Sequence, residues 1–451
     1  ARPAPRPSRP PVARGPARPR PVATRPAPQP RKPLVGALWG LRASSVLAAV
    51  GEGVVATALP LLTAALTRDP LSVAAVIAAA HLPWVVVTLL GGGLLPRLER
   101  RTVLGTAHTL RGGAVAVLAW AAAGNSETLG KLVTAAFVIG LGEALADHVE
   151  DGADDLPAPR PQPSGLARAL RSGGMVGLAV VGLPVGGLLY EKLPPVPFVA
   201  SVFVFCLAGL IALLPRAPLG SAPRERAMAP PPPLRLSPGT TRPTAVAAAQ
   251  ALGTSAVLGV LVLFALDDLG LGAPSFGVLL GALAAGATLG GLAAPEVGRV
   301  LGARRGTAAA ALVAALAYAV AAAVSSPSFP LPSAVALVLG SAAGMATGVL
   351  ARAELHARGG RRLGAGGLRA FHLVVWSAIP LGALVGGLVA EAFGVAVAVA
   401  LAGGVPAVVA AALALSLDQR RSTSGPNTGK WLTAADKRGA VARDRARGGA
   451  R

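Results

Sequence analysis

The chain has 451 residues, of which 53% are hydrophobic and only 14% charged, and its mean hydropathy is +0.61. Soluble globular domains carry about a quarter charged residues, so this composition excludes an ordinary soluble enzyme and favours the bilayer as solvent. The apolar runs are too long and unbroken for the alternating strands of a β-barrel. The one cysteine, Cys206, excludes a disulfide or a thiolate metal site within the chain.

The net charge of +22 is concentrated at the two ends of the chain. Residues 1–33 are mainly Pro, Arg and Ala without any acid, and residues 417–451 are again rich in arginine. Such compositions cannot bury a core, so we expect both tails to be disordered. Basic flanks of apolar segments are typical of cytoplasmic ends that touch anionic lipid, so we expect no nucleic-acid partner. The first tail contains no continuous apolar region, so we expect no cleavable signal peptide there.

Apolar runs of about 20 residues predict twelve transmembrane helices. They lie near residues 35–62, 71–95, 102–123, 129–149, 168–190, 196–214, 244–266, 275–296, 306–324, 333–352, 369–390 and 394–416. Alternate loops contain arginine clusters, whereas the opposite loops contain little more than Arg68, Lys131 and Lys192. This asymmetry predicts an all-α, multi-pass protein of the cell membrane with both termini in the cytoplasm.

A polar segment at 215–243, which includes four consecutive prolines, divides the predicted helices into two groups of six. We interpret it as a cytoplasmic linker between an N-terminal half (34–214) and a C-terminal half (244–416). A motif in the first half recurs in the second: Pro184, Gly186, Gly187, Leu188 and Glu191 match Pro380, Gly386, Gly387, Leu388 and Glu391. Two such halves, related by internal pseudo-symmetry, are typical of secondary transporters with a substrate site at the midplane.

Several motifs between residues 36 and 416 resemble the major facilitator superfamily, and more narrowly its actinobacterial drug and siderophore exporters. In the first span, Gly51-Glu52-Gly53 is followed by Ala58-Leu59-Pro60-Leu61-Leu62 and by Thr67-Arg68-Asp69-Pro70-Leu71. This order is similar to the pattern of that group. The resemblance implies a twelve-helix transporter that works by alternating access.

Two further motifs carry the same resemblance. The segment after span 2 is similar to the superfamily's loop signature, with Gly92, Gly93, Arg97, Arg100 and Arg101 at matching positions, although Pro96 and Glu99 depart from it. Small residues of span 5 resemble a glycine-rich motif of antiporters: Gly173, Gly182, Pro184, Gly186 and Gly187. Span 11, with Pro380, Gly382, Gly386 and Gly387, is similar to the pattern of the exporter group. Small residues let helix backbones approach closely, so we expect a gating seam there. The span 4 arginine motif of proton-coupled exporters is absent.

Ionisable residues deep in the predicted spans are the candidates for chemistry. Glu52 lies halfway along span 1, where an ionised carboxylate costs about 2.5–3.5 kcal/mol, and it is the candidate proton carrier. Arg111 lies midway along span 3, and Glu52 is its candidate partner by depth; a structural pair, or an arginine that snorkels to the interface, is the alternative. Glu143 in span 4 is deep enough to line a cavity, whereas Asp147, four residues further on, is expected at a solvated helix end.

Other residues have weaker assignments. Trp84, Gln250, His372 and Trp376 are possible cavity-lining residues, although packing alone accounts for Gln250 and His372 as well. His81 is expected to contact only water, and Glu296 to pair with Arg299 or Arg304. No nucleophile elbow, phosphate-binding loop or metal-ligand spacing occurs, so we expect neither an enzyme nor a cofactor.

Three functions fit these features. The first is proton-driven export of small lipophilic molecules, with the bilayer, a small-molecule substrate and protons as partners of a monomeric protein. The second is a uniporter or importer of a small nutrient. The third is a non-transporting membrane scaffold whose basic tails bind lipid.

Overall fold

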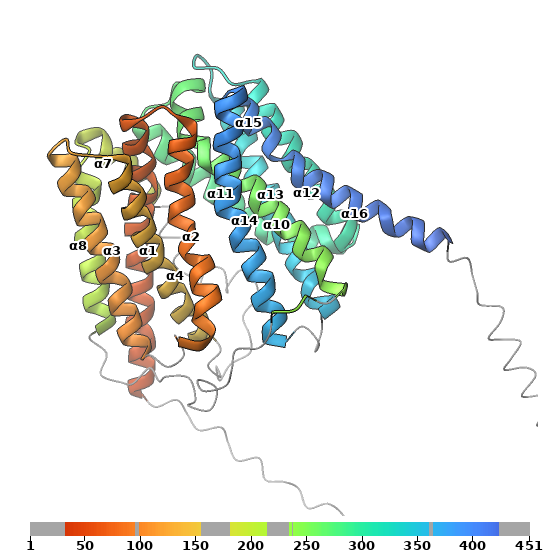
Figure 1. Cartoon of the computed structure of the whole chain (residues 1–451), viewed down its shortest axis with the longest axis horizontal. Coiled ribbons are helices and arrows are strands. Elements are labelled where there is room, and N and C mark those ends of the chain that lie inside the picture. The colour runs from red at the N-terminus through yellow and green to blue at the C-terminus, as the bar shows by residue number, and fades with distance from the viewer. Residues whose placement is uncertain are drawn as a thin grey trace, which may run out of the picture.

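The computed structural model describes residues 32–94, 99–154, 181–213, 234–236, 238–359 and 364–423, and every regular element in these ranges is a helix. The elements before the linker are α1 (Lys32–Leu66), α2 (Pro70–Leu94), α3 (Arg100–Ala123), α4 (Leu129–Asp154), α7 (Leu183–Lys192) and α8 (Val196–Leu213). Those after it are α10 (Pro238–Leu263), the π-helical turn η3 (Phe264–Asp268), α11 (Ala273–Leu301), α12 (Ala303–Ala323), α13 (Leu331–Gly359), α14 (Gly364–Phe393), α15 (Val395–Ala402) and α16 (Gly404–Thr423). The helices stand side by side in one bundle, the first set on the left and the second on the right (Figure 1).

Ten helical segments in the described ranges are long and apolar enough to cross a membrane. Two of the twelve predicted spans are not among them. The first is α3, which has 24 residues but whose hydropathy is lowered by polar residues such as His108 and Arg111. The second is the span predicted at 168–190, of which the described part begins at residue 181. The chain is therefore a multi-pass, all-helical membrane protein.

Several helix ends differ from the predicted boundaries. The span predicted at 394–416 is divided between α15 and α16 at Gly403, where an added Cβ would lie 2.4 Å from the Cα of Ala315 on α12. Helix α10 begins at Pro238, inside the segment interpreted as linker. Likewise α1 begins at Lys32 and α16 continues to Thr423, so both enter the predicted tails. The remainder of both tails and of the linker lies outside the described residues, apart from 234–236.

The most extensive contacts between the two sets are those of α2 with α14 and of α7 with α11, and α10 also contacts α2. Glycines make this approach close. A Cβ on Gly187 of α7 would lie 2.3 Å from the carbonyl oxygen of Ala273 on α11. A Cβ on Gly387 of α14 would lie 2.6 Å from the Cβ of Ala74 on α2. Any larger side chain at either position would separate the backbones.

Polar contacts join the two sets at both ends of the bundle. At the α1–α2 end, uppermost in Figure 1, Arg68 forms an ion pair with Asp267 at 3.0 Å. At the opposite end, Arg369 of α14 donates hydrogen bonds to the carbonyl oxygens of Thr88 and Leu89 on α2, each at 3.2 Å. The first contact joins two exposed side chains, whereas in the second a guanidinium group donates to backbone carbonyls of the last two turns of a helix.

Candidate functional site

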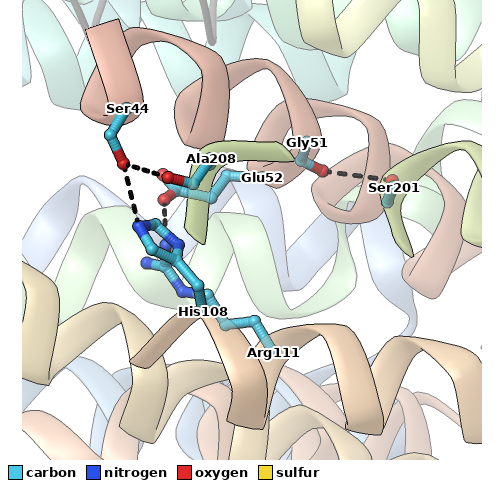
Figure 2. Close-up of polar contacts among 7 residues, drawn as sticks. All are labelled: Ser44, Gly51, Glu52, His108, Arg111, Ser201 and Ala208. Atoms are coloured by element: carbon cyan, nitrogen blue, oxygen red, sulfur yellow. Dashed lines mark hydrogen bonds and ion pairs between the residues drawn. The ribbon is translucent and has the colours of Figure 1, made fainter. Parts of the chain in front are cut away.

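Glycines on both sides of Glu52 let two helices pack tightly against α1 at this point. A Cβ on Gly51 would lie 3.0 Å from Val204 of α8. On the other side, a Cβ on Gly182 would lie 2.8 Å from the Cα of Gly53. Ser201 of α8 also donates a long 3.4 Å hydrogen bond to the Gly51 carbonyl (Figure 2). The Gly51-Glu52-Gly53 motif therefore holds the Glu52 backbone between α7 and α8.

The Glu52 side chain forms a buried ion pair with Arg111 of α3. Oε1 of Glu52 lies 2.7 Å from Nη1 of Arg111, whose side chain is only 1% exposed, whereas the Glu52 side chain is 24% exposed. The Arg111 guanidinium also lies over the buried Phe205 ring, 5.6 Å from its centroid. Nε and Nη1 of Arg111 have no aligned hydrogen-bond acceptor among the described residues. The pairing expected from depth in the span is thus present, but it leaves donor capacity unused.

Helix α4 brings Glu143 to the same place. A Cβ on its neighbour Gly142 would lie 2.6 Å from Cγ of Arg111 and 2.7 Å from the Ala107 carbonyl oxygen, so α4 can pack on Arg111 only because this residue is glycine. The Glu143 carboxyl interacts electrostatically with Glu52, Arg111 and Asp147, and its side chain is partly exposed. Glu143 therefore adds a second carboxyl group close to the Glu52–Arg111 pair.

A neutral histidine lies one helical turn before Arg111. Ser44 of α1 donates a 2.8 Å hydrogen bond to the Ala208 carbonyl oxygen, so its oxygen is free to accept one from Nε2 of His108 at 3.2 Å (Figure 2). Nδ1 of His108 has no partner among the described residues and is buried beside Arg111. A second positive charge next to the guanidinium would be repelled, so this arrangement fits the uncharged ring with its proton on Nε2.

An aromatic column connects α2 with α14 between the two sets of helices. The Trp84 and Trp376 rings stack with centroids 5.3 Å apart, and His81 stacks on Trp84 at 5.9 Å. Nδ1 of His81 is bonded to the Ile77 carbonyl, which corrects the expectation that this residue contacts only water. Nε1 of Trp84 is buried and has no partner among the described residues.

The two other residues proposed to line a cavity lie in the second set of helices. The Gln250 amide donates to the Thr254 hydroxyl at 3.0 Å, while its buried Oε1 has no partner among the described residues. A Cβ on Gly344 of α13 would lie 2.7 Å from the Gln250 amide nitrogen. The His372 ring lies 5.6 Å from that of Phe371. Gln250 belongs to α10 and His372 to α14, whereas Glu52, Arg111 and Glu143 belong to α1, α3 and α4.

The glycines expected to form a seam lie at close helix contacts. Cβ atoms on Gly182 and Gly186 would lie 2.6 Å from carbonyl oxygens of α1, those of Val50 and Val54. Cβ atoms on Gly382 and Gly386 would lie 2.2 and 2.4 Å from carbonyl oxygens of α10, those of Leu252 and Ala256. Pro184 is in the first turn of α7, and Pro380 is buried inside α14. Gly173 lies outside the described residues.

The loop signature is only partly described. Gly92 and Gly93 belong to the last turn of α2, and Arg100 and Arg101 open α3, so the connection between the helices is shorter than the motif. Arg97 lies outside the described residues. Glu296, as expected, forms an ion pair with Arg299.

Sequence reasoning missed the contacts that depend on helix orientation. The Ser44–His108 hydrogen bond, the Phe205 contact and the role of Gly142 involve residues with no distinctive spacing in the chain. A fourth omission is the buried Glu354, which forms ion pairs with three arginines. A carboxylate near the end of a predicted span was a signal for it.

The comparisons with known proteins agree with this architecture. Residues 29–431 match a family described as transmembrane secretion effectors, a group of the major facilitator type. The chain belongs to this family. It is thus a membrane transporter of the major facilitator type, and a transporter rather than an enzyme. No curated protein matches the chain.

Solved structures resemble this transporter in fold. A nucleoside transporter, NupG, has a TM-score of 0.62 and 16% identity, with 83% of this chain and 98% of that chain covered. A bacterial homologue of the iron transporter ferroportin, in an inward-facing state, has a TM-score of 0.60 and 19% identity, with 84% and 99% covered. At such identities the likeness concerns the fold alone.

Proposed function

We propose that this transporter exports small lipophilic compounds in exchange for protons, by alternating access across the cell membrane. The observation that carries the proposal is the charge of the cluster at the Glu52–Arg111 pair. Glu52 pairs with the Arg111 guanidinium and Glu143 interacts with both, so these three groups have a formal charge of −2 + 1 = −1 when both carboxyl groups are ionised, and Asp147 beside Glu143 adds to the negative excess. An excess charge at this depth is costly, so the cluster favours taking up either a proton or a cationic substrate.

Competition between proton and substrate gives the exchange. A substrate cation that pairs with one of the two carboxylates neutralises the excess negative charge, so the bound proton is released. When the cation leaves, the excess charge returns and a carboxyl group takes up a proton again. The family description, which refers to secretion, supports the outward direction. Apolar helix faces and the Trp84–Trp376 stack suit a lipophilic, flat molecule.

The proposal includes twelve helices in two related halves, with both termini in the cytoplasm. Matched contacts support the repeat: Gly186 meets the Val54 carbonyl and Gly386 meets the Ala256 carbonyl, at offsets of 200 and 202 residues. Gly187 and Gly387 each cross to the other half, to Ala273 and to Leu71. Equivalent glycines that meet equivalent helices are expected of a duplicated fold.

The test uses everted membrane vesicles with an acridine dye that reports the pH gradient. A panel of lipophilic cations, siderophores and antibiotics is added to the native protein, to Glu52→Gln and to the control Glu296→Gln, whose carboxylate is exposed. We expect at least one compound to collapse the gradient with the native protein and the control but not with Glu52→Gln. If Glu52→Gln behaves as native does, Glu52 is not the proton carrier. If no compound collapses any gradient, proton exchange is wrong and uncoupled transport of a nutrient becomes the better hypothesis.

A further inference from the structure

A second buried charged cluster lies far from Glu52, where α10, α12 and α13 meet at the end of the bundle opposite the α1–α2 end. Its centre is Glu354 of α13, whose side chain is 7% exposed. Three guanidinium groups surround its Oε1 atom: Arg358 at 2.7 Å, and Arg242 and Arg304 at 3.8 Å each. The formal charge of these four groups is +3 − 1 = +2. The cluster is therefore the electrostatic opposite of the acidic one at Glu52.

The Glu354 carboxylate does not accept hydrogen bonds from all three guanidinium groups. Only Arg358 is within hydrogen-bond distance of it, and 3.8 Å is too long for Arg242 and Arg304 to donate. The Arg242 side chain is nine-tenths buried, and its Nε and Nη1 atoms have no hydrogen-bond partner among the described residues. Arg304 and Arg358 are also close enough to repel it. A buried guanidinium with unused donors and like-charged neighbours is unfavourable without a further anion.

The helix ends add to the positive potential. Arg242 lies in the second turn of α10, and Arg304 is the second residue of α12. Both are thus near helix N-termini, where the macrodipole is positive and cations are disfavoured. Gly302 precedes α12 without a side-chain cap, so the first amide groups of that helix have no side-chain acceptor there. Uncapped amide groups and guanidinium groups with unused donors both favour the binding of an anion.

We propose that Arg242, Arg304 and the first turn of α12 form a binding site for a phosphate group, with Arg358 held beside it by Glu354. A tetrahedral oxyanion has enough acceptor oxygens to accept hydrogen bonds from Arg242 and Arg304 together. The Glu354 carboxylate, 3.8 Å from each of them, accepts none from either. The phosphate belongs either to a lipid headgroup or to a soluble anion, and the chemistry is the same. All three helices belong to the same half, so the bound phosphate stabilises that half without joining it to the other.

The experiment measures thermal unfolding of the purified full chain in an uncharged detergent at constant ionic strength. In one arm, inorganic phosphate is titrated against chloride. In the other, the protein is placed in nanodiscs of phosphatidylcholine with or without phosphatidylglycerol. The variants are Arg242→Gln and Arg304→Gln. The matched control is Arg299→Gln, which removes an exposed arginine, already paired with Glu296, close to the same loop.

We expect a saturable rise in Tm of a few degrees for the native protein and the control. For Arg242→Gln and Arg304→Gln, the apparent affinity should be weaker by about tenfold or more, the loss of one charge-assisted hydrogen bond. A response to inorganic phosphate identifies a soluble anion, and a response to phosphatidylglycerol alone identifies a lipid headgroup.

Two results overturn the proposal: no shift in either arm, or equal shifts in all variants. If Arg242→Gln does not fold, Arg304→Gln decides, because its side chain is 34% exposed and tolerates the change better.

Discussion

At the scale of single residues, the structure has two buried clusters with opposite excess charge. The Glu52 cluster has more carboxyl groups than cations, and the Glu354 cluster has two guanidinium groups more than it has acids. A charge that is buried without compensation is rarely retained for stability alone. We therefore expect each cluster to bind a neutralising group reversibly: a proton or cation at the Glu52 cluster and an oxyanion at the Glu354 cluster.

Gly142 offers a test of the Glu52 cluster that leaves its charges in place. In Gly142→Val the new side chain would displace Arg111, because a Cβ there lies 2.6 Å from Cγ of Arg111. We expect unfolding to be easier by about 1–3 kcal/mol, as for other overpacked cores, together with loss of substrate-induced proton flux. The measurements are Tm in detergent and the vesicle assay. Gly130→Val on the same helix is the control, since its Cβ meets nothing within 4 Å; equal losses in both variants would refute the role of Gly142.

At the scale of helices, short-range chemistry sets where each element begins, and glycine sets how near the elements come. The turn between α1 and α2 illustrates the first point. The Asp69 carboxylate accepts a 2.8 Å hydrogen bond from the Ser72 amide, so it caps the start of α2. Hydrogen bonds from the Ser72 side chain and amide hold the Asp69 pKa below its ordinary value of 3.8.

Replacement of this cap should lower stability in a pH-dependent way. Asp69→Ala removes the cap and should cost about 1 kcal/mol at neutral pH. Because the folded pKa is depressed, the ionised carboxylate stabilises the fold above pH 3.8, and this contribution is lost as the pH falls through the folded pKa. Tm of native, Asp69→Ala and Asp69→Asn proteins, compared at pH 7 and pH 3, tests this. Asp69→Asn retains the cap without the charge, so a native advantage over it that is undiminished between pH 7 and pH 3 contradicts the assignment.

At the scale of the whole molecule, the Arg68–Asp267 pair is one of the polar contacts that join the two sets of helices in the described part of the chain. Alternating access requires such contacts to break and reform as one side of the protein opens. Both side chains are more than half exposed, so the pair is worth only about 0.2–1 kcal/mol. That is enough to change the ratio of two conformations by up to about fivefold.

Reversal of one charge should therefore open the α1–α2 end. Asn125 lies between α3 and α4, and Ser328 lies between α12 and α13. We expect Arg68→Glu to lengthen the distance between spin labels at Asn125→Cys and Ser328→Cys in a Cys206→Ser background, because the introduced carboxylate and Asp267 would then repel each other. The double variant Arg68→Glu with Asp267→Arg should restore the native distance distribution. Electron–electron double resonance measures both. A single variant with the native distribution would mean that the pair does not hold this end closed.

The sequence by itself determined the solvent, the helical class and the approximate position of most helices, because the length and hydropathy of a span are local properties of the chain. It also indicated Glu52 and Arg111 as residues in need of partners, since depth along a span can be counted in residues. Only the tertiary structure decided the contacts between helices. These are the Glu52–Arg111 pair, the position of Glu143 near it, the His81–Trp84–Trp376 column and the three arginines around Glu354. The physical reason is that these contacts depend on how each helix is rotated and how closely its neighbours approach. In this chain that approach is controlled by glycines such as Gly142, whose effect on a neighbouring helix no local pattern reveals.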